Sequence, residues 1–394
     1  MDNKTVVVGY ARTPFGRFKG ALQGIPAVEL GALVIKEALR RSGLDPENVD
    51  NVLMGMVVQA GAGQIPSRQA TIKAGLPYSV PSDTINKVCA SGLRAANLGD
   101  TLIRSGDAGV IVAGGMENMS AVPYYLPEAR DGLRMGHGAV VDGMVHDGLW
   151  CPFHDVHMGV HGSAVPASHG ITREDMDSWA LRSHKLAVNA MDRGFFADEI
   201  VPVSVPRKKG EPLIIDQDEL PRKDTSMEKL ANLPPAFTRD GLITAGNAPG
   251  ISDGAGALVL TSQQRARELG IDPLAEIVSQ GQVSYEPQYI ATVPYAAAEK
   301  ALHKANLTIN NMNLIEVNEA FASVALTSIK LGGWDKDIVN VNGGAVAIGH
   351  PIGASGARIL MTLISALRSR GGGMGLATIC SGAAQGEAII VKVG

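Results

Sequence analysis

The sequence predicts an α/β protein made of two similar copies of one domain, with a long segment inserted into the first copy. The motif Ala-Ser-Gly-x-Arg occurs twice, and its serines, Ser91 and Ser355, are 264 residues apart. A block upstream of the motif, 37–55, is echoed at 300–318 with nearly the same spacing. Hydrophobic periods of helices and strands alternate within each copy, which is typical of layered α/β domains with mixed sheets. The repeat is far too long for a solenoid, so we expect two domain copies.

Each copy is expected to contain the same elements in the same order. An amphipathic helix leads through a turn to a buried strand, a second helix follows the Ala-Ser-Gly turn, and apolar strands follow that helix. A strand at 5–11 opens the chain, and the last strand, 386–394, has its counterpart at 254–262. The other expected elements are helices at 30–42, 90–105, 295–305 and 354–369, and strands at 51–58, 109–113, 313–317 and 374–379.

The segment 121–250 has no counterpart in the second copy. It is rich in Gly, Pro, His and charge, and it contains one clear helical pattern at 173–191. We therefore expect a large insertion that folds over one face of the first copy. The predicted domains are a first half at 1–120 that is completed by 251–270, an inserted loop domain at 121–250, and a second half at 271–394.

Composition excludes several classes of protein. A net charge of −4 argues against a surface built for nucleic acid or an anionic membrane. Three cysteines in 394 residues do not suggest a disulfide framework, so we expect a reducing, cytoplasmic compartment. No apolar run reaches the ~18 residues of a transmembrane helix. The first residues show no pattern of a signal peptide, and none is expected.

Cys89 stands at the beginning of an expected helix, directly before the first Ala-Ser-Gly turn. Unpaired backbone N–H groups and the helix dipole favour an anion there, so a thiolate would have a lowered pKa and act as a nucleophile. The small residues Ala90, Ser91 and Gly92 leave space for an acyl group and let N–H groups approach an oxyanion. The alternative is a buried, inert cysteine, and position alone leaves both interpretations open.

The second copy places further polar side chains at strand ends and helix starts. His350 lies in a glycine-rich turn, where a histidine either takes a proton from a thiol and binds an oxyanion, or is simply packed in a loop. Cys380 ends one apolar strand, and Asn318 ends another, where it would orient a water or cap the next helix. A pseudo-twofold axis between the copies would bring equivalent helix starts together. We therefore expect one cleft that these residues share with Cys89.

Long stretches throughout the chain carry a resemblance to a known family. They are ARTPFGRFKG (11–20), NKVCASGLRA (86–95), AGGMENMS (113–120), TAGNAPGISDGAGA (244–257), NEAFA (318–322), NGGAVAIGHPIGASGAR (342–358) and CSGAAQG (380–386). Together they resemble the thiolases, a family of acetyl-CoA acetyltransferases and 3-ketoacyl-CoA thiolases, over essentially the whole chain. The resemblance implies a duplicated thiolase fold, in which two similar βαβαβαββ halves stack as α/β/α/β/α layers with an inserted loop domain.

The resemblance also implies a two-stage, ping-pong reaction with named roles. Cys89 is similar to the nucleophile that holds the acyl group as a thioester, and His350 to the residue that activates this thiol. Cys380 resembles the acid/base that removes a proton from Cα of the second acetyl-CoA. Asn318 resembles the residue that holds a water in the enolate's oxyanion hole. Backbone N–H groups of Cys89 and Gly382 resemble the second oxyanion hole.

In this family the inserted segment binds CoA, so the same is expected here. The sequence departs from the family pattern at Pro249, where a serine is common, and at Lys229, where some members have an adenine-pocket serine. Ile290 and Ala291 replace a usual Met-Gly, which alters the wall of the acyl pocket. Basic residues near 207–209 and 222–229 either meet nucleotide phosphates or form a solvated loop. The expected binding residues are Leu149, His157, Met158, Arg222, Lys229, Phe237, Ala245, Ala248, Pro249 and Phe321.

Six of the nine histidines lie between 137 and 169. His154, His157 and His161 have a spacing that would place them on one face of a helix as metal ligands. The surrounding Gly and Pro argue against a long helix, and the family needs no metal, so no metal site is expected. Cys151 is interpreted as structural. No cofactor is expected, because the CoA thioesters are substrates.

The leading functional prediction is an acetyl-CoA C-acetyltransferase that condenses two acetyl-CoA into acetoacetyl-CoA and CoA, and catalyses the reverse thiolysis. A broader 3-ketoacyl-CoA thiolase of fatty-acid breakdown is the nearest alternative. A ketoacyl synthase-like enzyme is less favoured, because Cys380 stands where such enzymes have another residue type. A silent acyl-CoA-binding protein is disfavoured by the retention of both thiols and His350. The resemblance also suggests a homotetramer or homodimer.

Overall fold

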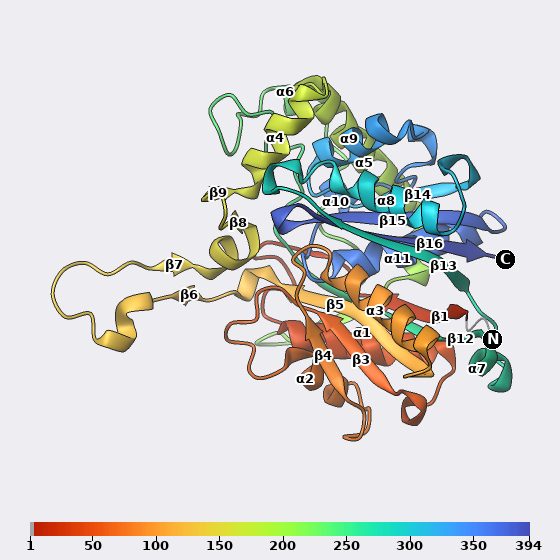
Figure 1. Cartoon of the computed structure of the whole chain (residues 1–394). Coiled ribbons are helices and arrows are strands. Elements are labelled where there is room, and N and C mark those ends of the chain that lie inside the picture. The colour runs from red at the N-terminus through yellow and green to blue at the C-terminus, as the bar shows by residue number, and fades with distance from the viewer. Residues whose placement is uncertain (1–3) are drawn as a thin grey trace.

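The computed structural model describes residues 4–394. Residues 1–3, which belong to the predicted first half, lie outside the described residues. The main sheet has ten strands, and its two ends belong to the two copies (Figure 1). In this part of the chain, 4–394, no helix is long and apolar enough to cross a membrane.

The first copy contributes the strand order β4-β3-β5-β12-β1, with β2 paired to β12. Helices α1 and α2 cover one face, and α3 packs on the other. Alternate residues of β5 serve the two faces: Ile111 packs with the core beneath α3, whereas Val110 and Val112 pack beneath α1. The elements are β1 (Thr5–Arg12), β2 (Gly16–Arg17), α1 (Ala27–Ser42), β3 (Asn51–Gly55), α2 (Pro66–Lys73), β4 (Ser82–Ile85), α3 (Ser91–Ser105), β5 (Val110–Asn118), β12 (Ser252–Ser262) and α7 (Gln263–Glu268).

The second copy contributes the order β14-β15-β16-β13. Helix α8 covers its outer face with α9 beside it, and α11 packs on the inner face. A single bridge between Ile315 and Val339 stands where the first copy has β4. The elements are β13 (Ala275–Ser284), α8 (Val293–Lys304), β14 (Leu314–Val317), α9 (Ala322–Gly332), α10 (Ala345–Ile348), α11 (Ser355–Arg368), β15 (Gly373–Ser381) and β16 (Gln385–Val393).

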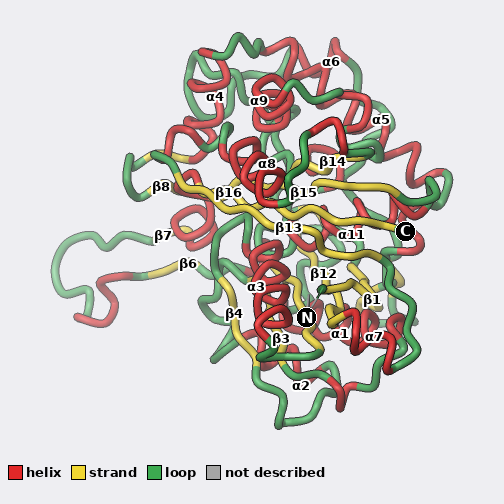
Figure 2. The backbone as a smooth tube through the Cα atoms, turned by 45° about the vertical axis from the view of Figure 1, so that its right-hand side comes forward, coloured by secondary structure: helices red, strands yellow, loops and turns green. Residues whose placement is uncertain are grey.

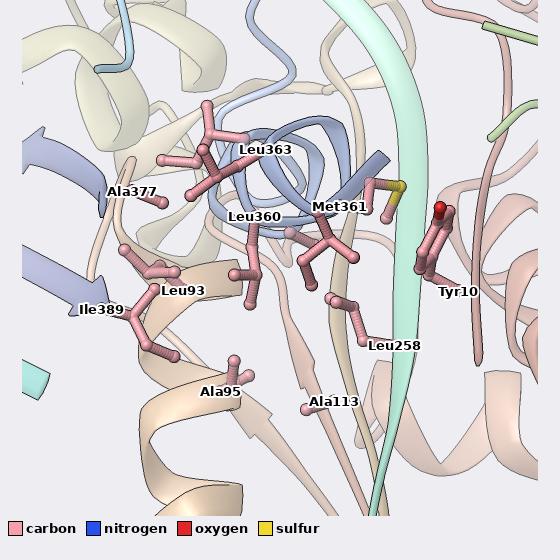
Figure 3. Close-up of a cluster of buried hydrophobic side chains, with 14 of the residues drawn as sticks. Tyr10, Leu93, Ala95, Ala113, Leu258, Leu360, Met361, Leu363, Ala377 and Ile389 are labelled. Atoms are coloured by element: carbon pink, nitrogen blue, oxygen red, sulfur yellow. The ribbon is translucent and has the colours of Figure 1, made fainter. Parts of the chain in front are cut away.

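The copies are joined where β1 pairs with β13, at Val6 with Glu276 and Val7 with Ala275. Helices α3 and α11 lie between the two parts of the sheet, which gives the expected order of layers, α/β/α/β/α. Figure 3 shows this central layer: Leu93 of α3 and Leu360 of α11 are enclosed by strand residues from both copies. Burying one leucine side chain contributes roughly 1.5–3 kcal/mol. The predicted α/β class and duplication are therefore confirmed.

The repeated Ala-Ser-Gly motif has a structural cause. A Cβ placed on Gly92 would lie 2.9 Å from the backbone nitrogen of Ala357, and one on Gly356 would lie 2.2 Å from that of Leu93. The starts of α3 and α11 therefore touch backbone to backbone, and the two glycines occupy equivalent places in this contact. The motif is scaffold in both copies, because only glycine permits this approach.

The inserted segment packs differently from the prediction. We expected it to cover the first copy, but α4 and α5 pack on α9, and α5 also packs on α10, all in the second copy. Burial of apolar side chains explains this packing, because Trp179 of α5 shares a buried hydrophobic cluster with Val324 of α9. A buried ion pair of Arg12 with Glu199 ties the segment back to the first copy. Its elements are β6 (Tyr124–Tyr125), β7 (Val141–Asp142), β8 (Trp150–Cys151), β9 (Val156–His157), α4 (Met158–Ser168), α5 (Arg173–Asp192), β10 (Val203–Val205), β11 (Leu213–Ile215) and α6 (Met227–Ala231).

Strands β6 and β7 form an arm that projects far from the rest of the molecule, as two views of the chain agree (Figures 1 and 2). Element boundaries otherwise follow the prediction closely. The main differences are that β3 ends at Gly55 rather than residue 58, and that β5 continues to Asn118 rather than residue 113. The division into two halves and an inserted domain, with its stated boundaries, stays a prediction.

Candidate active site

Cys89 sits in a tight turn between β4 and α3. The preceding residue, Val88, has a φ of 43°, which is strained for a β-branched side chain. Two side chains hold this turn: Asn86 accepts the N–H of Val88 at 3.1 Å, and the Ser91 hydroxyl donates to the Val88 carbonyl at 2.6 Å. Cys89 lies just before α3, at the helix start that the sequence predicted, and its side chain is buried.

A second strained turn follows β15 and meets the first. Ala383 and Ala384 both have positive φ, directly after Gly382. The Ser381 hydroxyl donates to the carbonyl of Lys87, so the two turns are bonded to each other. A Cβ on Gly382 would contact the Val88 side chain at 3.2 Å, which shows how little space separates the turns.

The predicted lowering of the Cys89 pKa is wrong. Burial raises the pKa of Cys89 to about 12, and hydrogen bonds from the backbone N–H groups of Cys89 and Gly382 offset only part of that rise. The helix start does supply the expected N–H groups, but its effect is smaller than the loss of hydration. The thiol is therefore protonated at neutral pH, and its use as a nucleophile requires a base. The same two N–H groups converge on the place where an oxyanion hole was predicted.

His350 is suited to be that base. Burial lowers the pKa of His350 to about 3, so the imidazole is neutral at pH 7. Nδ1 lies 2.6 Å from Oγ of Ser355, and that Oγ also lies 2.9 Å from the carbonyl of Pro351, four residues earlier in the chain. We assign the single hydroxyl proton to the carbonyl, so Ser355 accepts from Nδ1–H. Nε2 then carries a lone pair, and it is buried without a hydrogen-bond partner among residues 4–394.

Cys380 and Asn318 lie deeper than His350. Both are fully buried. Burial raises the pKa of Cys380 well above its usual value, and a charge on Cys89 would raise it further. Both polar atoms of the Asn318 amide lack a partner within the described chain, although they are buried. A buried amide without partners suggests a place for a bound water or substrate oxygen.

The backbone around Asn318 is held by its neighbour Glu319. The Glu319 carboxylate accepts hydrogen bonds from Trp179 Nε1 and Ser183 Oγ of α5, both at 2.8 Å, and from Asn340 at 2.9 Å. These bonds fix the end of β14 against the inserted segment. The inserted segment thus helps to hold the site, besides covering it.

A cavity of about 450 Å³ opens onto Cys89 and His350. His157 stacks on Phe237 with ring centroids 4.1 Å apart, and Phe321 meets Phe237 edge to face at 6.3 Å. Cys380, Asn318 and Gly382 are not among the lining residues of this cavity. Of the predicted binding residues, the lining contains Leu149, His157, Met158, Arg222, Phe237, Ala245, Ala248, Pro249 and Phe321.

A second, wider cavity of about 670 Å³ adjoins the first. The two share Arg222, Ala245 and Ala248 among their lining residues, and Lys229 lines only the outer one. Lys229 is held by Asp224, with Nζ at 2.7 Å from the carboxylate. The basic run 207–209 is exposed between β10 and β11 and lines neither of these cavities. The cavities form one route from solvent to the thiol.

Sequence reasoning missed two supporting residues. Ser355 was noticed only as part of the repeated motif, and its contact with His350 depends on the turn between them. Glu117 is buried, and its carboxylate accepts N–H groups from Val57, Val58 and Gly353 at 3.0–3.2 Å. It therefore bonds the two copies together beside Cys89. Its place in the AGGMEN stretch gave no hint of a bridging role.

The chain is similar to known proteins over nearly its whole length. Residues 5–264 match the family described as Thiolase, N-terminal domain, and residues 271–393 match Thiolase, C-terminal domain. The chain is 51% identical to an acetyl-CoA acetyltransferase of Pseudomonas aeruginosa and 49% identical to one of Cupriavidus necator, each over 98% of both chains. A crystal structure of the Bacillus anthracis acetyl-CoA acetyltransferase superposes with a TM-score of 0.97 at 39% identity, covering 100% of this chain and 99% of that one.

Proposed function

This chain belongs to the thiolase family of acyltransferases, and we propose that it condenses two acetyl-CoA into acetoacetyl-CoA and CoA, and catalyses the reverse thiolysis. The family resemblance inferred from the motifs is thereby confirmed. The observation that carries the proposal is that one route from solvent ends in a cavity lined by the buried thiol of Cys89 and by His350, whose Nε2 has no hydrogen-bond partner among residues 4–394.

In the first stage, His350 Nε2 takes the proton of the Cys89 thiol as the sulfur attacks the thioester carbonyl. The bond between Cys89 sulfur and the acyl carbon forms, and the negative charge moves to the carbonyl oxygen. The N–H groups of Cys89 and Gly382 stabilise that oxyanion. The bond to CoA then breaks, and the departing CoA sulfur takes the proton from His350. A neutral His350 is required at the start, which fits its lowered pKa.

In the second stage, Cys380 acts on Cα of a second acetyl-CoA. Its resting thiol is protonated because burial raises its pKa, so the neutral His350 first takes the Cys380 proton, and the resulting thiolate then removes the Cα proton. A thioester Cα is a very weak acid, so the raised pKa of Cys380 makes its thiolate a suitably strong base. A water held by Asn318 would stabilise the enolate oxygen. The enolate carbon attacks the acyl carbon on Cys89, and the thioester bond breaks. The released Cys89 sulfur takes the proton from His350, and Cys380 keeps the Cα proton, so all three groups return to their starting state. No cofactor takes part in these steps.

Short acyl chains are the proposed substrates, because the stacked His157 and Phe237 and the buried Ile290 occupy the wall of the inner cavity. The outer cavity, with Arg222 and Lys229, would hold the nucleotide end of CoA. The test is kcat/KM for thiolysis of 3-ketoacyl-CoA substrates of increasing length. A steep fall beyond the four-carbon substrate supports the proposal, whereas a flat profile favours the broader 3-ketoacyl-CoA thiolase of fatty-acid breakdown.

Assembly, compartment and pathway belong to the same proposal. The projecting arm exposes Tyr124, Leu126 and Met135, which suits contact with further copies in a homodimer or homotetramer. Three free cysteines suit the reducing cytoplasm. A place in fatty-acid metabolism stays a prediction. Light scattering of the full chain, with and without the arm residues 126–140, measures the assembly directly.

A further inference from the structure

Cys151, His154 and His161 form a cluster outside the catalytic site that the proposed reaction does not use. Their potential ligand atoms all lie within 4.8 Å of one another. Nδ1 of His154 and Nε2 of His161 are 3.0 Å apart, and the two rings meet nearly at right angles. The sequence spacing had suggested His154, His157 and His161 on one helix face. That arrangement is wrong, because α4 begins only at Met158.

We propose that Cys151, His154 and His161 bind a divalent transition metal, zinc by preference. One thiolate and two imidazoles make a donor set of borderline softness, which suits zinc and cobalt rather than magnesium or calcium. Three protein ligands leave one tetrahedral position for water. This proposal replaces the expectation that the chain has no metal site, and it assigns the metal no part in the acyl transfer.

The three ligands come from two elements, the β8–β9 hairpin and helix α4. Cys151 is buried on β8 and paired with Val156 of β9. The turn between these strands carries His154, and Nε1 of Trp150 donates to the Asp155 carboxylate at 2.8 Å across it. His161 is buried in the first turns of α4. The cluster is therefore built by a hairpin and the helix that follows it, with His154 in the turn of the hairpin.

The distances suit a metal after a small contraction. Tetrahedral zinc with bonds of ~2.0–2.3 Å holds its donor atoms roughly 3.3–3.8 Å apart. The histidine nitrogens, at 3.0 Å, would move slightly apart, and the widest separation, which is within 4.8 Å, would close by no more than roughly 1–1.5 Å. His154 is exposed, so its ring can make most of that adjustment and the metal can enter from solvent.

The cluster lies next to residues that line the acyl cavity, so a bound metal would affect the cavity wall. His157 and Met158 line the acyl cavity and lie between His154 and His161 in the chain. His157 itself does not join the cluster, because its Nδ1 accepts the N–H of Gly159 at 3.0 Å and its ring stacks on Phe237. A metal that joins the β8–β9 hairpin to α4 would therefore restrict the movement of His157 and Met158 in the cavity wall.

The test is a cobalt titration of the full chain after removal of bound metal with a chelator. We expect one Co²⁺ per chain, with a thiolate-to-cobalt charge-transfer absorption that zinc abolishes by displacement. Cys151→Ser should remove the absorption. His154→Gln should raise the Kd for Co²⁺ at least about tenfold, because loss of even an outer-shell partner typically costs 10–100-fold.

Matched variants separate this site from the others. Cys89→Ser and Cys380→Ser remove the two remaining thiols, and His169→Gln removes another histidine at the end of α4; all three should leave the absorption unchanged. Because Cys151 is buried, thermal unfolding without metal checks that Cys151→Ser folds, and the exposed His154 carries the test if it does not. The proposal is overturned by absence of the absorption, by its persistence in folded Cys151→Ser, or by an unchanged Kd in His154→Gln.

Discussion

Replacing Ser355 by alanine tests how the structure prepares His350 as a base. The substitution removes the hydroxyl that lies 2.6 Å from Nδ1 in a fully buried environment. The Nδ1–H group then has no acceptor there, and leaving a buried donor unpaired costs roughly 1–3 kcal/mol. The ring relieves this cost by turning or by moving its proton to Nε2, and either change removes the lone pair from the thiol.

If that cost appears in the transition state for acylation, the rate falls by roughly 5- to 150-fold, because 1.36 kcal/mol is tenfold. The assay is rapid mixing with acetyl-CoA, acid quench and mass measurement of the acetylated chain. Ser369→Ala is the matched control, since its hydroxyl only donates to the Ala366 carbonyl near the end of the same helix. The variant Ser355→Ala should lose rate with little change in the acetyl-CoA concentration at half-saturation. An unchanged acylation rate in folded Ser355→Ala would refute the assigned tautomer.

Three further predictions address the second thiol, the raised pKa and the scaffold. Cys380→Ser should still form the acyl-enzyme, yet lose condensation by at least about 10²-fold because the Cα base is gone; condensation at the normal rate would exclude that role. Because the pKa of Cys89 is raised to about 12, its thiolate fraction grows about tenfold per pH unit from pH 7 to pH 10, and alkylation by iodoacetamide should grow with it. An alkylation rate that levels off near pH 8.5 would show that Cys89 has the pKa of an ordinary thiol. Gly356→Ala should lower the free energy of unfolding by about 1–3 kcal/mol or more, because the added Cβ would meet the Leu93 backbone. Gly24→Ala is the control and should leave the free energy of unfolding nearly unchanged, because no atom lies within 4 Å of its added Cβ. Urea unfolding measures both variants. Equal midpoints for the two glycine variants would contradict the close contact.

The repeated motif made much of the fold predictable. Elements around Ser91 and Ser355 appear near their expected positions because hydrophobic period and chain punctuation are local properties. The packing of 121–250 was not predictable in this way, because its apolar residues, such as Trp179, find their partners in the second copy only after the chain has folded. Sequence periodicity shows that a face is apolar, and not which surface covers it.

The candidate site shows the same limit of what can be predicted from the sequence. The chain places Cys89 at a helix start, and helix-start chemistry alone predicts a lowered pKa. Burial reverses that direction, and burial is a property of the whole fold. The roles of Ser355 and Glu117, and the grouping of Cys151 with two histidines, likewise depend on turns and a hairpin that bring residues together. No spacing rule contains that information.

The central claim is that Cys89 carries the acyl group, and mass measurement tests it most directly. The intact chain is incubated with acetyl-CoA, quenched in acid, weighed, and then digested to locate the adduct. We predict one acetyl group per chain on the peptide that contains Cys89, and no adduct in Cys89→Ala. An acetyl group located on Cys151 or Cys380, or an adduct that persists in Cys89→Ala, would contradict the assignment.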